Sequence, residues 1–326
     1  MARKVPRGMS RRRFVTLLAS ALPLSATATA TATATILAGG QRISPIRWNG
    51  IAMGAQARMT LLHEDKPLAL AAMGAAIAEL NRLENIFSLY EPNSEVSRLN
   101  RDGHLKEPSL DLVRLLSEAR AISKTTAGAF DVTVQPLFEA YARQGGTAPS
   151  PMDLAGARRL VDQRGVMIAS DRISFQRQGM AITLNGIAQG YITDRVSELL
   201  RRRGFADTLV DLGEIRSNGA GPQGQGWPIA IAAAKLRLAN RALATSSAAG
   251  HRFDRQGTLH HLILPSDGLP SMKFDSLSVL APTATLADGL STGLSLIEPH
   301  TLASIVSELP GINVLATTAA GSLIQI

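Results

Sequence analysis

One stretch decides how this chain folds: Leu184-Asn185-Gly186-Ile187-Ala188-Gln189-Gly190-Tyr191-Ile192-Thr193-Asp194. A short apolar run, residues 180–182, precedes it, and apolar residues at helical spacing follow it as far as Leu200. This order predicts a strand, a tight glycine turn and the start of a helix. Glycines four residues apart allow close backbone approach, and free amides at a helix start favour an anion such as a phosphate. The alternative is a turn whose glycines serve packing alone.

On both sides of this stretch, helical periodicity alternates with short segments of strand-like alternation. The strands follow one another as in hairpins, with helices between groups of strands, which favours an α+β fold over a doubly wound parallel sheet. Helices are predicted at residues 68–87, 110–125, 152–163, 283–296 and 302–309, with a short turn or helix at 95–99 and an interrupted helix at 130–142. Strands are predicted after residues 53–55, at 207–212, 214–218, 227–233, 242–246, 259–264, 276–281, 311–316 and 322–326, and as short pieces within 166–182.

The net charge of +8 suggests a nucleic-acid partner, but the position of the charge argues against one. Residues 1–13 hold six basic residues and no acidic one, and residues 14–40 hold no charge. The high pI therefore belongs mostly to the first residues of the chain, and we expect no nucleic-acid surface. The chain has no cysteine, which excludes disulfides, thiolate metal sites and cysteine nucleophiles.

The first 40 residues have the form of an export signal. Ser10-Arg11-Arg12-Arg13-Phe14-Val15-Thr16 resembles a twin-arginine motif, an apolar run continues to Leu24, and an Ala/Thr tract, residues 26–35, offers small-residue cleavage positions. We therefore expect residues 1–40 to be a twin-arginine signal with a low-complexity tract, and the mature protein to be periplasmic. The alternatives are a membrane anchor or a disordered tail, but the apolar run is short and rich in threonine for a spanning helix. No later segment has a transmembrane pattern.

Two groups of residues carry candidate chemistry. Asp288 and Thr292 stand four apart on one face of a predicted helix, and a carboxylate with a hydroxyl suits a hard cation such as Mg²⁺. The alternative is a surface aspartate with a threonine bonded to its own helix. His260 and His261 are adjacent, so in a strand they point to opposite faces and one of them could face a site. Two ordinary strand histidines are the alternative.

Several motifs in this order resemble the ApbE-like FAD:protein FMN transferase family, over residues 48–326. Each motif alone is weak, and their common order makes the resemblance specific. The matching segments are Met53-Gly54-Ala55, Phe87-Ser88-Leu89-Tyr90, Ser94-Glu95-Val96-Ser97-Arg98-Leu99-Asn100, Gly128-Ala129-Phe130-Asp131-Val132-Thr133-Val134-Gln135-Pro136-Leu137, Gly186-Ile187-Ala188-Gln189-Gly190-Tyr191 with Asp194, Thr245-Ser246, His260-His261-Leu262-Ile263, and Ala287-Asp288 with Ser291-Thr292.

The resemblance implies a fold and a reaction. The fold would be a mixed α/β one with antiparallel-rich sheets and flanking helices, in a single transferase domain at residues 41–326. The reaction would split FAD and attach FMN through a phosphoester to a Thr or Ser hydroxyl of an exported or membrane protein, with Mg²⁺ required and AMP released. The acceptor would carry an Asp-x-x-x-Gly-Ala-Thr-like segment.

The resemblance also assigns roles to single residues. Mg²⁺ would be held by Asp288, Thr292 and the backbone carbonyl of Ala188. His261 would accept the proton of the acceptor hydroxyl, and Tyr90 would pack on the isoalloxazine ring. The positions around the flavin dinucleotide would be Met53, Tyr90, Ala129, Phe130, Asp131, Asn185, Tyr191 and Ile263.

The chain departs from the family pattern at three positions. Thr183 stands where the family commonly has Asp, Gln189 where it has Lys, and Glu214 where it has Gly. Two other functions therefore stay open: an Mg²⁺-dependent FAD pyrophosphatase, and a non-catalytic flavin-binding assembly factor. The segment at residues 212–216 and the Trp48-x-Gly start resemble a proteobacterial branch that includes accessory proteins of nitrous oxide respiration, which implies a membrane electron-transfer protein as the target.

Overall fold

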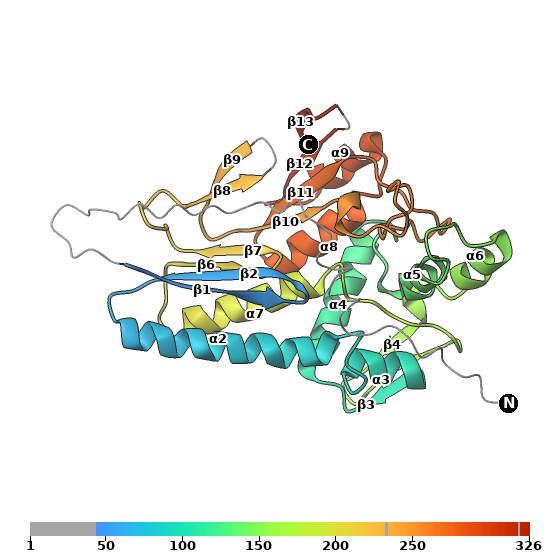
Figure 1. The fold of residues 1–326 in the computed structure, drawn as a ribbon, viewed down its shortest axis with the longest axis horizontal. Helices are drawn as coiled ribbons and strands as arrows, with labels where there is room; N and C mark the ends of the chain where they lie inside the picture. The colour runs from blue at the N-terminus through green and yellow to red at the C-terminus, as the bar shows by residue number, and fades with distance from the viewer. Residues whose placement is uncertain (1–43, 232–233, 319) are drawn as a thin grey trace.

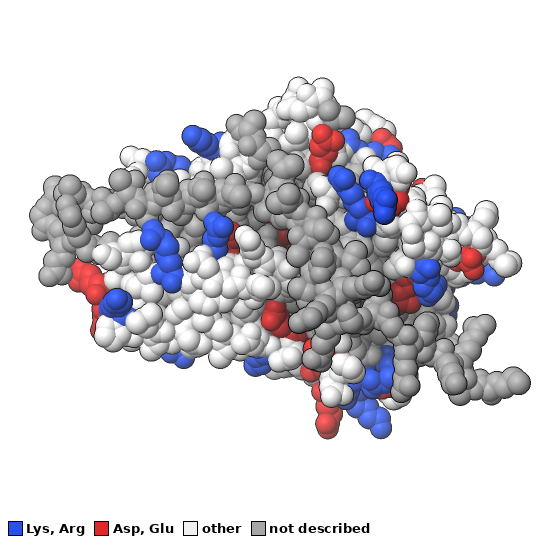
Figure 2. Space-filling view, viewed as in Figure 1, with Lys and Arg blue, Asp and Glu red and all other residues white. Residues whose placement is uncertain are grey.

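The computed structural model describes residues 44–231, 234–318 and 320–326 (Figure 1). The predicted signal and Ala/Thr tract, residues 1–40, lie outside the described residues. Within the described part, no helix combines the length and the apolar character needed to cross a bilayer. On the face drawn in Figure 2, basic and acidic side chains of the described residues are interspersed.

An eight-stranded sheet forms the centre of the fold, in the order β1-β2-β6-β7-β10-β11-β12-β13. Every neighbouring pair in this sheet is antiparallel, which confirms the predicted α+β class. Its strands are β1 (Pro45–Ala52), β2 (Ala55–Leu62), β6 (Thr208–Asp211), β7 (Ile215–Asn218), β10 (Ala242–Ser246), β11 (Ser276–Ala281), β12 (Asn313–Thr317) and β13 (Leu323–Gln325).

Helices cover one face of this sheet. Helix α2 (Lys66–Phe87) and helix α7 (Ala188–Arg202) lie side by side along β1, β2 and β6, and α8 (Ala284–Leu294) packs on β10 and β11 (Figure 1). On the other face, the hairpin of β8 (Trp227–Ile231) and β9 (Ala234–Leu238) packs its apolar side chains on the sheet. The large core therefore lies between the sheet and the helices, where the opening stretch is found.

Further elements extend the helical side. They are α3 (Glu95–Asp102), α4 (Leu110–Thr125), α5 (Gln135–Ala142), α6 (Pro151–Arg158), α9 (Pro299–Ser307), the 3-10 turns η1 (Val132–Val134), η2 (Gln163–Gly165) and η3 (Ala248–Gly250), and a small sheet of β3 (His104–Lys106), β5 (Arg172–Phe175) and β4 (Val166–Ile168). Side-chain oxygens of Asp65, Ser94, Ser109 and Ser150 accept amide hydrogen bonds at the starts of α2, α3, α4 and α6. These caps explain why the helices begin where they do.

Helices α7 and α8 cross at Gly190, where no side chain fits. A Cβ atom at this position would lie 2.3 Å from the carbonyl oxygen of Ala284 and 2.7 Å from the Cβ of Asp288. The second glycine of the opening stretch therefore lets two helix backbones meet.

We expect Gly190→Ala to lower the free energy of unfolding by about 1–3 kcal/mol, because the added methyl group meets a helix backbone that cannot move aside. Gly74→Ala is the matched control: it lies on α2 with nothing within 4 Å of its Cβ position, and we expect it to stabilise α2 by up to about 1 kcal/mol. Urea unfolding followed by circular dichroism measures both changes. A Gly190→Ala protein as stable as the wild type would contradict the tight crossing.

Two predicted strands are wrong. Residues 180–182 form no strand, because the side chain of Asn100 bonds both main-chain polar groups of Ile182, each at 2.8 Å. Residues 259–264 also form no strand, and only isolated bridges join His260 to Arg252 and Ile263 to Pro270. The two adjacent histidines therefore lie in irregular backbone, and the opposite-face argument does not apply to them.

Candidate active site

The start of α7 binds a carboxylate of the chain itself. The amide of Gly190 donates to Oδ2 of Asp288 at 2.9 Å, across 98 residues of sequence. Amides in the first turn of a helix lack partners within the helix and attract negative charge. The anion found at this helix start is therefore Asp288, and the opening stretch and the Asp288–Thr292 pair belong to one site.

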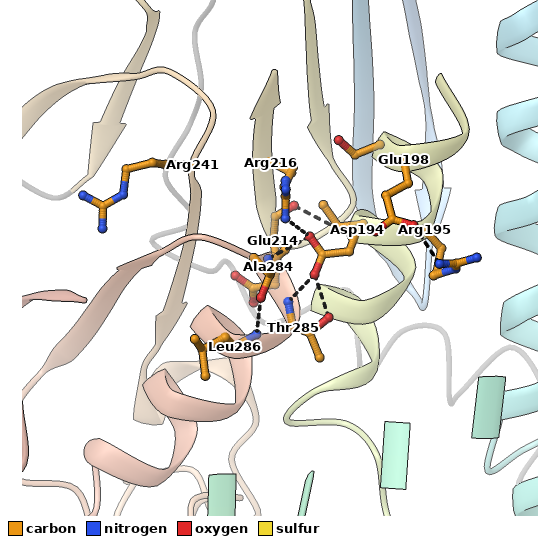
Figure 3. Close-up of polar contacts among 12 residues, drawn as sticks. Asp194, Arg195, Glu198, Glu214, Arg216, Arg241, Ala284, Thr285 and Leu286 are labelled. Atoms are coloured by element: carbon orange, nitrogen blue, oxygen red, sulfur yellow. Dashed lines mark hydrogen bonds and ion pairs between the residues drawn. The ribbon is translucent and has the colours of Figure 1, made fainter. Parts of the chain in front are cut away.

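Asp194 holds the start of α8 in place (Figure 3). Its Oδ1 accepts the amide of Ala284 at 2.9 Å, and its Oδ2 accepts the amide and the hydroxyl of Thr285 at 2.8 and 2.6 Å. Arg216 of β7 pairs with the same carboxylate at 2.5 Å. Because α8 carries Asp288, this network ties the position of the candidate site to the central sheet.

Asp288 is a buried carboxylate without a cationic partner. Its exposed fraction is 4%, and among the described residues the Gly190 amide is its side chain's one hydrogen-bond donor, with no ion pair. Burial raises the pKa of this carboxyl to about 7, the Gly190 amide opposes the rise, and the nearby charge of Asp194 adds to it. A bound cation would restore the charge balance of such a group.

Thr292 lies one helical turn after Asp288. Its Oγ1 is 3.5 Å from the carbonyl oxygen of Gly186 and 3.4 Å from Oγ of Ser246 at the end of β10. A Cβ on Gly186 would lie 3.0 Å from Thr292 Oγ1, so the glycine leaves this hydroxyl its space. Hydroxyl, carbonyl and carboxylate oxygens thus converge between α7, α8 and β10.

This donor set fits a hard cation. Mg²⁺ is usually bound by one or two carboxylates, with water and substrate phosphates completing its shell. In the described ranges, no three His, Asp or Glu side chains gather as a metal cluster, so oxygens of other kinds have to complete the set. Ala188, whose carbonyl is the third predicted ligand, is the buried first residue of α7, two positions before Gly190. Asp288 contacts the first turn of α7, the helix that begins at Ala188.

His261 lies in the irregular segment after η3. Its Nδ1 is 3.1 Å from the carbonyl oxygen of His251, so Nδ1 carries the proton and donates it, and Nε2 keeps the lone pair. Burial lowers the pKa of this imidazole to about 4, the hydrogen bond to His251 opposes the shift, and the neighbouring His251 and His260 add to it. At neutral pH the ring is therefore uncharged and can accept a proton at Nε2.

This environment predicts that His261 weakens the fold in acid. Because the pKa of the ring is about 4 in the folded protein and 6.5 ordinarily, the unfolded chain binds the proton first, and stability is lost as the pH falls through this window. We expect the unfolding free energy of the wild type to drop by about 1–3 kcal/mol more than that of His261→Gln between pH 7 and 4.5. Urea titrations measure this, with the exposed His300→Gln as control. Parallel pH profiles of wild type and His261→Gln would contradict the prediction.

Three predicted flavin positions gather near the end of α2. Met53 forms the turn between β1 and β2 with φ of 48°, and its amide bonds a carboxylate of α2. Tyr90 follows α2 in a loop and is 51% exposed, so its ring offers a stacking surface. Tyr191 is buried instead, with its hydroxyl donating to Asp111 at 2.8 Å and its ring edge-on to Phe87.

The other predicted flavin positions spread from Gly186 toward α5. Phe130 lies against this glycine, with ring Cε2 3.4 Å from the Cβ position, and the exposed Asn185 directly precedes it. Ala129 is buried in a small apolar cluster, and Ile263 is buried in a separate cluster against α5. The structure thus brings Phe130 and Asn185 next to the candidate cation site and places Ile263 farther along the helical side.

Asp131 is engaged in hydrogen bonds. Its Oδ1 accepts the amide and hydroxyl of Thr133 at 2.8 and 2.6 Å, and its Oδ2 accepts the amide of Gln163 at 3.1 Å. Burial raises the pKa of this carboxyl, and these bonds oppose the rise. Asp131 borders a cavity of about 640 Å³ beside the exposed face of α4, whose lining does not include Asp288 or Thr292.

The sequence pattern assigns no role to two residues that the structure brings to the site, Asp194 and Ser246. Asp194 caps a helix 90 residues further along the chain. Ser246 reaches α8 from β10, at 2.8 Å from Oγ of Ser291. For Asp194, one signal was available in the sequence: an acidic residue on the apolar face of a predicted helix. A carboxylate buried there requires hydrogen-bond or ionic partners.

Comparisons with known proteins identify the family of this chain. The model of the ApbE family matches residues 53–316. A FAD:protein FMN transferase of Haemophilus influenzae is 32% identical over 231 residues, which are 64% of this chain and 67% of that protein. One of Klebsiella pneumoniae is 26% identical over 285 residues, 80% of this chain and 81% of that protein.

A solved structure shows the same architecture. The apo form of the flavinyl transferase ApbE of Pseudomonas stutzeri aligns with a TM-score of 0.76 at 27% identity, covering 87% of this chain and 95% of that one. The family model spans the opening stretch, Asp288 and His261 alike. The chain belongs to the ApbE family.

Proposed function

We propose that this protein transfers the FMN half of FAD to a hydroxyl group of another protein and releases AMP. Relatives named FAD:protein FMN transferase support this reaction type. The observation that carries the proposal is the buried Asp288 at the α7–α8 crossing, next to Thr292 and without a cationic partner. Such a site is suited to phosphate chemistry, in which charge stabilisation and positioning dominate.

The reaction makes one bond and breaks one. The acceptor oxygen bonds to the phosphorus of the FMN half, the phosphorus–oxygen bond to the AMP half breaks, and AMP leaves with the bridging oxygen. The acceptor hydroxyl loses its proton in this step. His261 accepts that proton at Nε2, because its Nδ1 is committed to His251 and burial keeps the ring neutral.

We propose Asp288, Thr292 and the carbonyl of Ala188 as the groups that would hold Mg²⁺. Their hard oxygen donors fit this ion, which when bound offsets the negative charge of the pyrophosphate and of the leaving AMP. Tyr90 presents its exposed ring to the isoalloxazine. Phe130 and Asn185 border the site from the Gly186 side and orient the substrate.

The acceptor we propose is a Thr or Ser of an exported or membrane protein, such as a membrane electron-transfer protein. The twin-arginine-like residues 10–16 support a periplasmic location. A reporter enzyme fused behind residues 1–43 tests this: it should reach the periplasm in cells with the twin-arginine translocase and stay inside in cells without it. Export in both strains would contradict the proposal.

One incubation tests the reaction. The mature protein is mixed with FAD, Mg²⁺ and a peptide domain that carries an Asp-x-x-x-Gly-Ala-Thr segment, and the domain is examined by mass spectrometry after denaturation. We expect a mass increase of one FMN on the threonine, with AMP released in equal amount, and no increase on a Thr→Val domain. FMN and AMP formed without an acceptor would indicate a pyrophosphatase, and FAD bound but intact would indicate an assembly factor.

A further inference from the structure

Glu214 is a second buried acid at the candidate site. It lies at the turn from β6 into β7 and is 8% exposed. Its carbonyl oxygen accepts the amide of Leu212 at 3.1 Å and the hydroxyl of Thr193 of α7 at 3.3 Å. Its carboxylate accepts the amide of Thr245 of β10. Glu214 is therefore held from α7 and β10, two of the elements that form the cation site.

Residues next to Glu214 contact residues next to the predicted ligands. Gly213 has φ of 104°, and its Cβ position lies 2.4 Å from Nε2 of Gln189, the residue before Gly190, so the side chain of Gln189 packs on this turn. The amide of Thr245 donates to the Glu214 carboxylate. The next residue, Ser246, has its Oγ 3.4 Å from Oγ1 of Thr292. The turn that carries Glu214 thus contacts α7 next to Gly190, and its carboxylate bonds β10 next to Ser246.

The acidic side chains around Glu214 are not balanced by basic ones. Arg216, two residues on, is engaged by Asp194, and in the described part of the chain no basic side chain pairs with Glu214 or Asp288. Only one oxygen of Asp288 accepts a hydrogen bond from a described side chain or amide. Burial raises the pKa of the Glu214 carboxyl well above its ordinary value, and the charges of Asp288 and Asp211 raise it further.

We propose that Glu214 adds a second negative charge to the cation site built on Asp288, and that it thereby sets the affinity of the site for a divalent ion. The inference rests on the proposed cation site, and it assigns to Glu214 a role that the three predicted ligands do not cover. Two buried carboxylates whose charges repel each other favour a doubly charged ion, because a bound ion relieves the repulsion.

The test removes the charge of Glu214 by substitution and measures the binding of a divalent ion. Mn²⁺ is the probe, and its dissociation constant is measured by electron paramagnetic resonance, with Mg²⁺ as competitor. We expect Glu214→Gln to weaken Mn²⁺ binding at least 10-fold. Without a divalent ion the variant is expected to melt at a higher temperature than the wild type, and with Mg²⁺ its gain in melting temperature should be smaller. A merely structural glutamate would not produce this opposite pair of shifts.

Two further variants keep the result decisive. Glu214→Gly removes the same charge with the smallest residue and is expected to behave like Glu214→Gln if the latter folds poorly. Glu198→Gln, on the outer part of α7 where the acid pairs with Arg195 and Arg202, loses the same charge away from the site and should bind Mn²⁺ like the wild type. Equal Mn²⁺ affinity of the wild type and both Glu214 variants overturns the inference and leaves the proposed function standing. A wild type that binds no Mn²⁺ overturns the cation site itself, and the inference with it.

Discussion

Asp288→Ala is expected to lower the rate of flavin transfer by about 10³-fold or more. The change removes the buried carboxylate that the Gly190 amide orients, and the other two proposed ligands, Thr292 and the carbonyl of Ala188, carry no charge. Charge stabilisation by a bound ion contributes several kcal/mol to reactions of this kind, and each 1.4 kcal/mol is about a factor of ten in rate. Single-turnover transfer of FMN to the acceptor domain measures the loss.

Two companion variants separate chemistry from folding. Asp288→Asn keeps an acceptor for the Gly190 amide, so it should fold like the wild type and still lose transfer. Asp171→Ala, an exposed aspartate in the turn between β4 and β5, should transfer at the wild-type rate. An Asp288→Asn protein with more than a tenth of the wild-type rate would remove Asp288 from the proposed mechanism.

His261→Ala is expected to slow transfer by about 10²–10⁴-fold, the usual contribution of a positioned general base. FAD binding should change by no more than a few-fold, because the proposed role of His261 is to accept a proton from the acceptor. The neutral ring and the committed Nδ1 leave Nε2 as the one basic atom of this side chain. Single-turnover rates and quenching of flavin fluorescence measure the two quantities separately.

The histidine prediction has its own controls. Added imidazole should restore part of the rate of His261→Ala, since the deleted ring leaves space beside Gly250, whose Cβ position lies 3.0 Å from Cε1 of the ring. His300→Ala, on the exposed start of α9, should not respond to imidazole. A dissociation constant for FAD that rises as much as the rate falls would assign His261 to binding instead of proton transfer.

Much of the fold follows from local patterns. The helix predicted at residues 110–125 is α4, and the strands predicted at 242–246 and 276–281 are β10 and β11, with the same bounds. These segments have strong periodicity and clear ends, such as the Ser109 cap. Strand β1 was not predicted, because its apolar residues alternate weakly and its pairing with β2 depends on the turn at Met53 and Gly54, where both φ angles are positive.

The two wrong strand predictions have different causes. The apolar run at residues 180–182 has the composition of a strand, but the amide group of Asn100 supplies the hydrogen bonds that a neighbouring strand would have provided. The segment with His260 and His261 is rich in apolar residues, which pack on α5 and in a small separate cluster, and its main chain makes only isolated bridges. The partner of Ile182 is 82 residues away in the sequence, and the partners of residues 260–264 lie in loops on either side of them; local spacing indicates neither.

By itself, the sequence determined the α+β class, most helices and strands, and the pairing of Asp288 with Thr292, because periodicity and the i, i+4 relation act within a single element. Only the tertiary structure decided that the Gly190 amide holds Asp288, that Asp194 caps α8, and that Glu214 is buried against Thr193 of α7. These contacts join residues up to 98 positions apart. Which partner a buried charge finds depends on distance in space, and the crossing of α7 and α8 over the sheet creates that proximity.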